Sequence, residues 1–181
     1  MNIIRTAIPE VLIFEPRVFA DDRGFFLESW NQRKSREAFG FDVNFVQDNR
    51  SRSNRDVLRG MHYQIEQPQG KLVSVIRGSI FDVAVDMRKS SPNFGKWVSA
   101  ELSEDNQRQI WVPVGFAHGF LVLSESADVI YKTTDYYAPE HERCLLWNDP
   151  EVAIDWPLER EPVMSGKDKL GQRLSEIQAF K

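Results

Sequence analysis

The stretch KLVSVIRGSIFDVAVDM, residues 71–87, predicts the fold class of this chain. In IFDVAVDM, residues 80–87, large apolar side chains alternate with aspartate or alanine, which is the period-two pattern of a β-strand with two unlike faces. RGSI, residues 77–80, has the composition of a tight turn before that strand. The stretch therefore predicts two neighbouring strands joined by a short turn.

Other segments of strand length recur along the chain, separated by Gly, Pro, Asn or Ser. They are KWVSAEL (96–102), RQIWVPVGFAHGFLVL (108–123) and ADVIYKTTDYY (127–137). Helix is scarce: NQRKSREAFG (31–40) has Asn31 as an N-cap and Gly40 as a stop, and KDKLGQRL (167–174) can form one short turn. This pattern predicts a mainly β sandwich or barrel with a few short helices.

Length and composition indicate one domain, residues 1–181, because a chain of this size with 41% hydrophobic residues can fill a single core. The segment from Tyr136 to Lys181 is richer in proline and charge, and we expect it to wrap the barrel. Cys144 is the one cysteine, so no intramolecular disulfide can form. Since Arg5 and Pro9 interrupt the apolar residues of the N-terminus, we also expect a cytoplasmic protein.

The charge and hydropathy of the chain exclude two classes of partner. The net charge is −4 and the 23 Lys and Arg residues are spread along the chain, so nucleic acid gains no general attraction. No window has the apolar length of a membrane span, and the mean hydropathy is −0.44. A small anionic ligand remains possible, because a few converging cations suffice to bind one pyrophosphate.

His118 lies in PVGFAHGF, residues 113–120, where Pro113 and Gly115 predict a turn and His118 opens the next strand. This arrangement resembles the second motif of the cupin superfamily, which implies a double-stranded β-helix, a jelly-roll barrel. The first cupin motif has two histidines, two residues apart, that bind a metal. Here the corresponding segment is HYQIE, residues 62–66, with Gln64 in place of the second histidine.

Three interpretations of His62 follow. It can belong to a metal site with His118 and Glu66, a two-histidine, one-carboxylate set typical of metal-dependent oxygenases. It can be a merely structural histidine. The third interpretation is a metal-free site, which is favoured because His62 is accompanied by groups that a metal centre does not need, namely Arg59, Lys71, Tyr131, Lys167 and Asp168.

Several further stretches make a more specific resemblance, in order from about residue 14 to residue 168. They are FADDRGFFLESW (19–30), FVQDN (45–49), VLRGMHYQ (57–64), QGKLV (69–73), PVGFAHGF (113–120), YKTTDYY (131–137), LLWNDP (145–150) and IDWP (154–157). Together they resemble the dTDP-4-dehydrorhamnose 3,5-epimerase family, whose members invert C3 and C5 of a nucleotide-linked 4-keto sugar. The resemblance implies an isomerase of dTDP-rhamnose biosynthesis that uses no cofactor and no metal.

The resemblance also implies roles for four residues. His62 matches the general base and Asp168 its partner, which holds the imidazole in one tautomer. Lys71 matches the residue that stabilises the enolate oxygen, and Tyr131 matches the acid that returns a proton to the opposite face of the ring.

Further positions match residues that bind the nucleotide sugar. Arg23 and Arg59 match the arginines that hold the pyrophosphate, and Tyr137 matches the aromatic residue that stacks on thymine. The remaining ligand-contacting positions are Glu28, Gln47, Asn49, His118, Glu142 and Lys167.

One conflict and two rival functions stay open. Strict alternation places Arg59 and His62 on opposite faces of their strand, so either Gly60 permits a bulge or Arg59 serves a neighbouring subunit. The resemblance implies a homodimer with exchanged strands, which would allow the second solution. An epimerase that acts at C3 or C5 alone can keep the same base and acid, and a non-catalytic sugar-nucleotide binding module can share the fold.

Overall fold

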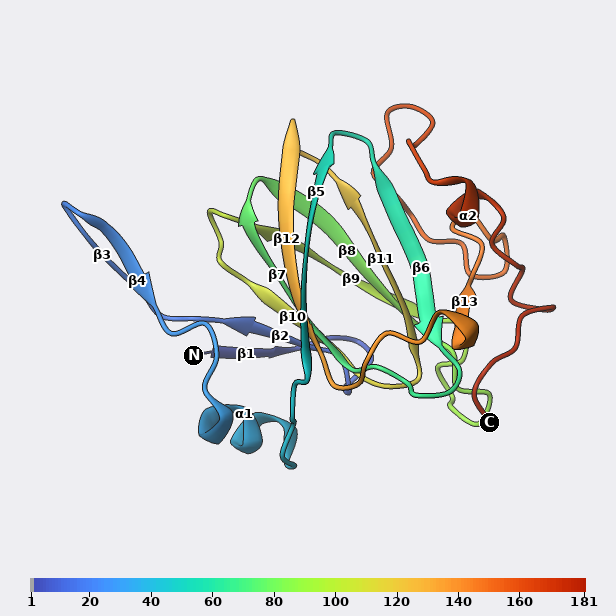
Figure 1. Ribbon diagram of the computed structural model, residues 1–181, viewed down its shortest axis with the longest axis horizontal. Coiled ribbons are helices and arrows are strands. Elements are labelled where there is room, and N and C mark those ends of the chain that lie inside the picture. The colour runs from blue at the N-terminus through green and yellow to red at the C-terminus, as the bar shows by residue number, and fades with distance from the viewer. Residues whose placement is uncertain (1) are drawn as a thin grey trace.

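Two β-sheets pack face to face to form a barrel, and one hairpin extends from its side (Figure 1). The chain is described here by a computed structural model that covers residues 2–181, apart from the side chain of Ala38. In spatial order, the first sheet contains β1 (Asn2–Arg5), β2 (Leu12–Glu15), β10 (Gln109–Val112), β7 (Lys71–Arg77), β12 (Ser126–Thr133) and β5 (Gln47–Asn54). The second contains β13 (Glu142–Cys144), β6 (Leu58–Gln64), β11 (Phe116–Val122), β8 (Ser79–Asp86) and β9 (Trp97–Ser103). The predicted mainly β, cupin-like barrel is confirmed.

A short connection joins β7 and β8 where a tight turn was predicted, at residues 77–80, but the chain bends there from one sheet to the other, so the two strands do not pair as a hairpin. Strand β7 ends at Arg77 and β8 begins at Ser79, with Gly78 between them at φ +76°. A Cβ atom at Gly78 would lie 2.1 Å from the carbonyl oxygen of Ser126, so both the backbone angle and the space require glycine here.

The alternation in β8 is also present, although neither face is open to solvent. Ile80 and Ala84 face the core between the two sheets, whereas Val83 and Val85 face a second core on the outer side of the five-stranded sheet. Asp82 shares the inner face and is fully buried. Because the inner face of this strand lines the barrel, Asp82 is placed close to the functional groups described below.

The outer face of the five-stranded sheet is covered by the C-terminal part of the chain, as Figure 1 shows in orange and red. Leu145, Val152, Trp156 and Ile177 are buried there. This segment contains the short helix α2 (Gly166–Lys169), and a 3₁₀ turn, η1 (Pro139–His141), precedes β13. The segment thus carries Asp168 back to the barrel.

Helix α1 (Gln32–Phe39) covers one end of the six-stranded sheet. As predicted, the Asn31 side chain caps its first turn, and Gly40, at φ +79°, ends it. Phe39 packs against Trp111, with 4.8 Å between the ring centroids. No helix in the described part of the chain is long and apolar enough to cross a membrane.

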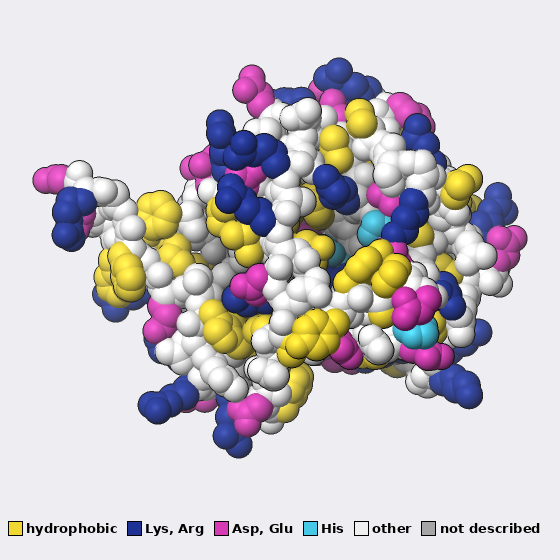
Figure 2. Space-filling model, viewed as in Figure 1, with side chains coloured by type: hydrophobic (Ala, Val, Ile, Leu, Met, Phe, Trp, Pro, Cys, Tyr) yellow, Lys and Arg dark blue, Asp and Glu magenta, His cyan; other side chains and the backbone are white. Residues whose placement is uncertain are grey.

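Strands β3 (Val18–Asp21) and β4 (Gly24–Leu27) form the hairpin that extends from the barrel (Figure 1). Both strands carry large apolar side chains in solvent, with Phe25 61% exposed and Phe26 70% exposed. Figure 2 shows hydrophobic side chains gathered on this extension. An isolated two-stranded hairpin has little stability of its own. Exposed apolar surfaces of this kind are typical of contacts with another molecule.

Candidate active site

A cavity of about 690 Å³ opens at one side of the barrel and brings together residues that are distant in the sequence. Figure 2 shows a hollow on this face, with a histidine side chain between Lys or Arg side chains. Of the residues expected to act on or bind a ligand, eleven line this cavity: Gln47, Asn49, Arg59, His62, Lys71, His118, Tyr131, Tyr137, Glu142, Lys167 and Asp168.

A bulge in β6 resolves the conflict between Arg59 and His62. His62 pairs with His118 on β11, whereas Arg59 pairs with Phe120, so β6 uses three steps where β11 uses two. Gly60 is the extra residue, at φ +121°, and a Cβ atom there would lie 2.5 Å from the Cα of Gly119. Both side chains therefore line the same cavity.

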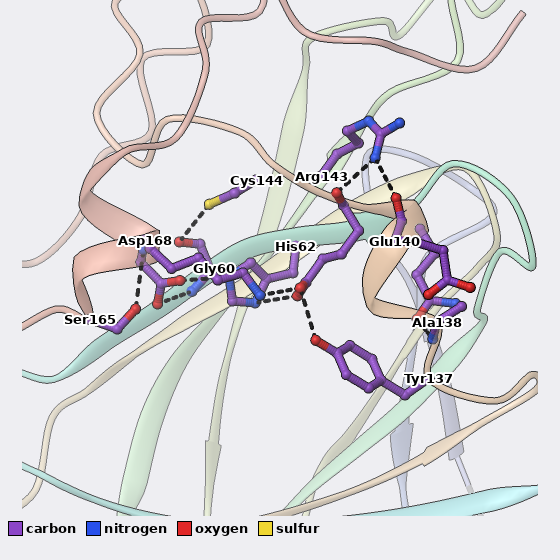
Figure 3. Close-up of polar contacts among 12 residues, drawn as sticks. Gly60, His62, Tyr137, Ala138, Glu140, Arg143, Cys144, Ser165 and Asp168 are labelled. Carbon is purple, nitrogen blue, oxygen red and sulfur yellow. Dashed lines mark hydrogen bonds and ion pairs between the residues drawn. The ribbon is translucent and has the colours of Figure 1, made fainter.

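His62 and Asp168 form a hydrogen-bonded pair on the wall of the cavity (Figure 3). His62 Nε2 lies 2.7 Å from Asp168 Oδ1, and the backbone N–H of Gly60 donates to Asp168 Oδ2 at 3.4 Å. Ser165 caps α2 by accepting from the N–H of Asp168, which fixes the backbone that carries the carboxylate. Burial acts to raise the pKa of Asp168, but the hydrogen bond and charge interaction with His62, together with the hydrogen bonds of Gly60 and Ser165, lower it overall.

Lys71 begins β7 and is buried, with 8% of its surface exposed. Its Nζ donates to the backbone oxygen of His62 at 3.2 Å, which places the ammonium beside that residue. Burial lowers the pKa of Lys71 to about 8, although the charges of Glu142 and Asp82 act in the opposite direction. The cavity therefore holds a cation that can stabilise a developing negative charge.

Tyr131 lies on β12, in the sheet opposite the one that carries His62. It is half-buried, and burial raises the pKa of its hydroxyl, with Arg59 acting to lower it. A phenol that stays protonated can serve as a proton donor. The cavity thus has a histidine on one sheet and a protonated tyrosine on the other.

His118 is held by a carboxylate that the sequence analysis did not single out. Asp82, on the neighbouring strand β8, places its two carboxylate oxygens 3.0 and 2.9 Å from His118 Nε2. Burial raises the pKa of Asp82, and His118 and Lys71 act to lower it. The alternation in residues 80–87 could have flagged Asp82 as an inward-facing aspartate. His118 is the third residue of β11, not its first as expected from PVGFAHGF.

Tyr137, Glu142 and Lys167 form a second polar group in the lining of the cavity. The hydroxyl of Tyr137 donates to Glu142 Oε2 at 3.1 Å (Figure 3), and Lys167 Nζ pairs with the same oxygen. Glu142 Oε1 lies 4.0 Å from His62 Nδ1. The imidazole is therefore flanked by two carboxylates, one on each side.

The metal site considered from His62, His118 and Glu66 is not assembled. Glu66 is exposed and pairs with His141 at 3.7 Å, and it is not among the residues that line the cavity. Among the described residues, potential ligand atoms of His62, Asp168 and Cys144 do lie within 4.8 Å of one another. Burial raises the pKa of the Cys144 thiol to about 12, which disfavours the thiolate that binds metals.

Two of the predicted ligand-binding residues lie away from the cavity of their own chain. Arg23 is in the turn of the β3–β4 hairpin and pairs with Asp21, and Glu28, just after β4, pairs with Lys34. Neither lines the cavity. Arg23 therefore lies at the end of the hairpin, whereas Glu28 is held beside the start of helix α1.

The comparison with protein families gives one match that spans nearly the whole chain. Residues 5–176 match the family described as dTDP-4-dehydrorhamnose 3,5-epimerase. The chain belongs to the dTDP-4-dehydrorhamnose 3,5-epimerase family. It is therefore a carbohydrate epimerase, and the alternative of a non-catalytic binding module is not supported.

Individual members of the epimerase family are similar over their full length. A dTDP-4-dehydrorhamnose 3,5-epimerase of Pseudomonas aeruginosa is 61% identical over 180 residues, which is 99% of each chain. A crystal structure of a dTDP-6-deoxy-D-glucose-3,5-epimerase from Legionella pneumophila, in complex with dTDP-4-keto-L-rhamnose, superposes with a TM-score of 0.95. That protein is 54% identical, and the match covers 98% of this chain and 94% of the other.

A 3′-monoepimerase from Streptomyces bikiniensis, in complex with dTDP-quinovose, has the same fold. Its TM-score is 0.89 at 32% identity, with 94% of this chain and 87% of the other covered. Since epimerases of one and of two carbons share this barrel, the fold does not distinguish them, whereas the higher identity to the 3,5-epimerases does favour double epimerisation.

Proposed function

We propose that the chain converts dTDP-4-dehydro-6-deoxy-D-glucose to dTDP-4-dehydro-L-rhamnose by inverting C5 and C3 of the sugar. The observation that carries the proposal is the placement of His62 and Tyr131 on opposite sheets. Asp168 is hydrogen-bonded to His62, and the buried Lys71 lies beside it. Inversion requires a base on one face of the ring and an acid on the other.

His62 is proposed as the base. Asp168 accepts from His62 Nε2, which leaves Nδ1 as the nitrogen that can take a proton from carbon. Asp168 also stabilises the imidazolium that forms, since its carboxylate is ionised and lies 2.7 Å away. A positioned base of this type contributes roughly 10²- to 10⁴-fold in rate.

Lys71 is proposed to stabilise the enolate. A proton beside a ketone is acidic only because the charge moves to the ketone oxygen, so a cation near that oxygen lowers the barrier. Lys71 is suited to this role because burial removes water that would otherwise screen its charge. Tyr131 then delivers a proton to carbon from the opposite face, which inverts the centre.

The nucleotide is proposed to bind through Arg59 and Tyr137 of this chain and through Arg23 of a second copy. Guanidinium groups suit the pyrophosphate oxygens, and Tyr137 offers an aromatic face to thymine. Gln47, Asn49, His118, Glu142 and Lys167 complete the ligand contacts from the same cavity, and Glu28 joins Arg23 from the second chain.

A homodimer with strand exchange is proposed for the assembly. It is supported by the exposed phenylalanines of the β3–β4 hairpin and by the distance of Arg23 from the cavity of its own chain. We further propose that residues 1–181 work as one catalytic unit in the cytoplasm, in synthesis of rhamnose for a cell-wall polysaccharide or a lipopolysaccharide O antigen. The free thiol of Cys144 is compatible with a reducing compartment.

Solvent exchange tests the function. The protein is incubated with substrate in D₂O, without added metal, and deuterium is located on the sugar by NMR. Label at both C3 and C5 is expected, and label at one carbon alone would establish the single-site alternative. Absence of label at both carbons would overturn the proposed reaction.

A further inference from the structure

Gln64 occupies the position at which a metal-binding cupin carries its second histidine, but its side chain is fully engaged with backbone. Its Nε2 donates to the carbonyl of Gln67 at 2.7 Å and to the carbonyl of Tyr136 at 3.1 Å. Its Oε1 accepts from the N–H of Ala138 at 3.0 Å. The residue is 4% exposed, although it borders the cavity.

These contacts leave Gln64 no free donor for a ligand. A glutamine amide has two N–H groups, and both are used by carbonyl oxygens of the chain. A histidine or carboxylate at this position could make at most part of the same set. The side chain is therefore built to hold backbone rather than to bind substrate or metal.

Two of these three contacts, those with Tyr136 and Ala138, hold the backbone on either side of Tyr137. Tyr137 is 53% exposed and lies between β12 and η1, where the chain has no regular secondary structure. Its own N–H donates to Gln47 Oε1 at 3.1 Å. Gln64 on β6 and Gln47 on β5 thus fasten the same short segment to the two opposite sheets.

We propose that Gln64 is a positioning residue that fixes the backbone of residues 136–138, so that the Tyr137 ring is presented to the nucleotide base in its bound orientation. This rests on the proposed function, in which Tyr137 stacks on thymine. A segment that is ordered before binding loses less conformational entropy when the ligand binds. Gln64 therefore acts on affinity for the nucleoside, with no part in proton transfer.

The test compares Gln64→Met, which keeps the length of the side chain and removes all three hydrogen bonds, with Gln107→Met. Gln107 also donates to a backbone carbonyl, that of Glu104, but in a turn that does not line the cavity. For Gln64→Met we expect the dissociation constant of dTDP, measured by calorimetry, to rise about tenfold, while that of inorganic pyrophosphate stays within about twofold. KM should rise similarly and kcat should change much less, and Gln107→Met should match the wild type.

Two further measurements separate positioning from a general loss of stability. Hydrogen exchange should become faster at the Ala138 amide in Gln64→Met, and remain as in the wild type in strands β8 and β11. In a Tyr137→Ala background, Gln64→Met should have no further effect on dTDP affinity, because the ring on which it acts is gone. If Gln64→Met does not fold, Gln64→Glu replaces it in every measurement. This variant keeps the shape of the side chain, but its carboxylate cannot donate to the carbonyl oxygens of Gln67 and Tyr136 and is repelled by them.

The outcomes distinguish this inference from the proposed function. A wild-type protein that does not bind dTDP would overturn the proposed function and the stacking role with it. Wild-type binding of dTDP, with unchanged affinity and unchanged Ala138 exchange in the Gln64 variant, would overturn the positioning role alone. An equal loss of dTDP affinity in the presence and absence of the Tyr137 ring would also overturn it.

Discussion

Arg59 and His62 line the same cavity although three positions separate them on strand β6. The bulge at Gly60 makes this possible by adding one residue to β6 relative to β11. The residues proposed to bind the pyrophosphate and to act as the base are thereby placed on one strand within one site. The Cβ of any other residue at position 60 would meet the backbone of Gly119, so this placement depends on glycine.

The His62–Asp168 pair is expected to determine the rate of proton removal. His62→Asn should lower kcat by at least about 10²-fold, and Asp168→Asn should lower it as well, because the amide neither fixes the same tautomer nor stabilises the imidazolium. Deuterium exchange at C3 and C5 and the affinity for dTDP are measured. We expect exchange to be lost at both carbons and the affinity to be unchanged. Normal exchange in His62→Asn would contradict its role as base.

Tyr131→Phe should separate exchange from inversion. The base can still remove a proton and return a solvent deuteron to the same face, whereas the opposite face has lost its acid. We expect deuterium at the reacting carbons with retention of configuration, and little rhamnose-configured product by NMR. Full inversion in this variant would show that another group donates the proton.

Lys71 should give the activity a limit at alkaline pH. Burial lowers its pKa to about 8, so kcat should decline as the pH rises above this value and the ammonium loses its proton. Lys71→Met should lower kcat strongly at every pH, and its residual activity should no longer decline above pH 8. Its matched control is Lys132→Met, which removes a lysine that pairs with Asp48 and does not line the cavity.

The same pKa predicts the effect of Lys71 on stability. Between pH 8 and the ordinary value of 10.5, the unfolded chain binds a proton that the folded chain does not, so the contribution of Lys71 to the free energy of unfolding rises with pH in this window. Below pH 8 the buried charge destabilises the fold by about 3 kcal/mol. Lys71→Met is thus expected to be inactive but more resistant to urea at pH 7, and a less stable variant would contradict this.

Strand exchange can be tested by complementation between inactive chains. Arg23→Ala and His62→Asn should each be weakly active, the first through poor nucleotide binding and the second through loss of the base. If the hairpin serves the partner, a mixed dimer has one intact site, and a mixture should regain about a quarter of wild-type activity after subunit exchange. The control is a mixture of Lys71→Met and His62→Asn. Both residues belong to the site of one chain, so neither site of the mixed dimer is intact and no activity should return.

Asp82→Asn tests whether the charge of Asp82 influences the pKa of Lys71. Asp82 holds His118 Nε2 in the interior of the barrel, and its charge also acts to raise the pKa of Lys71. The variant is expected to shift the alkaline limit of activity to lower pH, because Lys71 loses a neighbouring negative charge. An unchanged pH profile of kcat would contradict the coupling of Asp82 to Lys71.

Local sequence patterns determined much of this protein. The alternation in residues 80–87 predicted strand β8, and Asn31 and Gly40 set the ends of α1, because capping and pleating depend on neighbours in the chain. The histidine, lysine and tyrosine of the site were identified from short motifs that resemble those of a known family, and each of the three residues lies on a strand. Spacing of this kind is a property of the sequence alone.

The tertiary structure decided what those residues contact. Asp168 reaches His62 only because the C-terminal segment crosses the outer face of the five-stranded sheet, and Gly60 unites Arg59 with His62 only because β6 bulges against β11. Asp82 and Gln64 gained their roles in the same way, as buried polar groups that must find partners from other strands and loops. Sequence spacing cannot reveal such partners, because they are selected by packing between segments far apart in the chain.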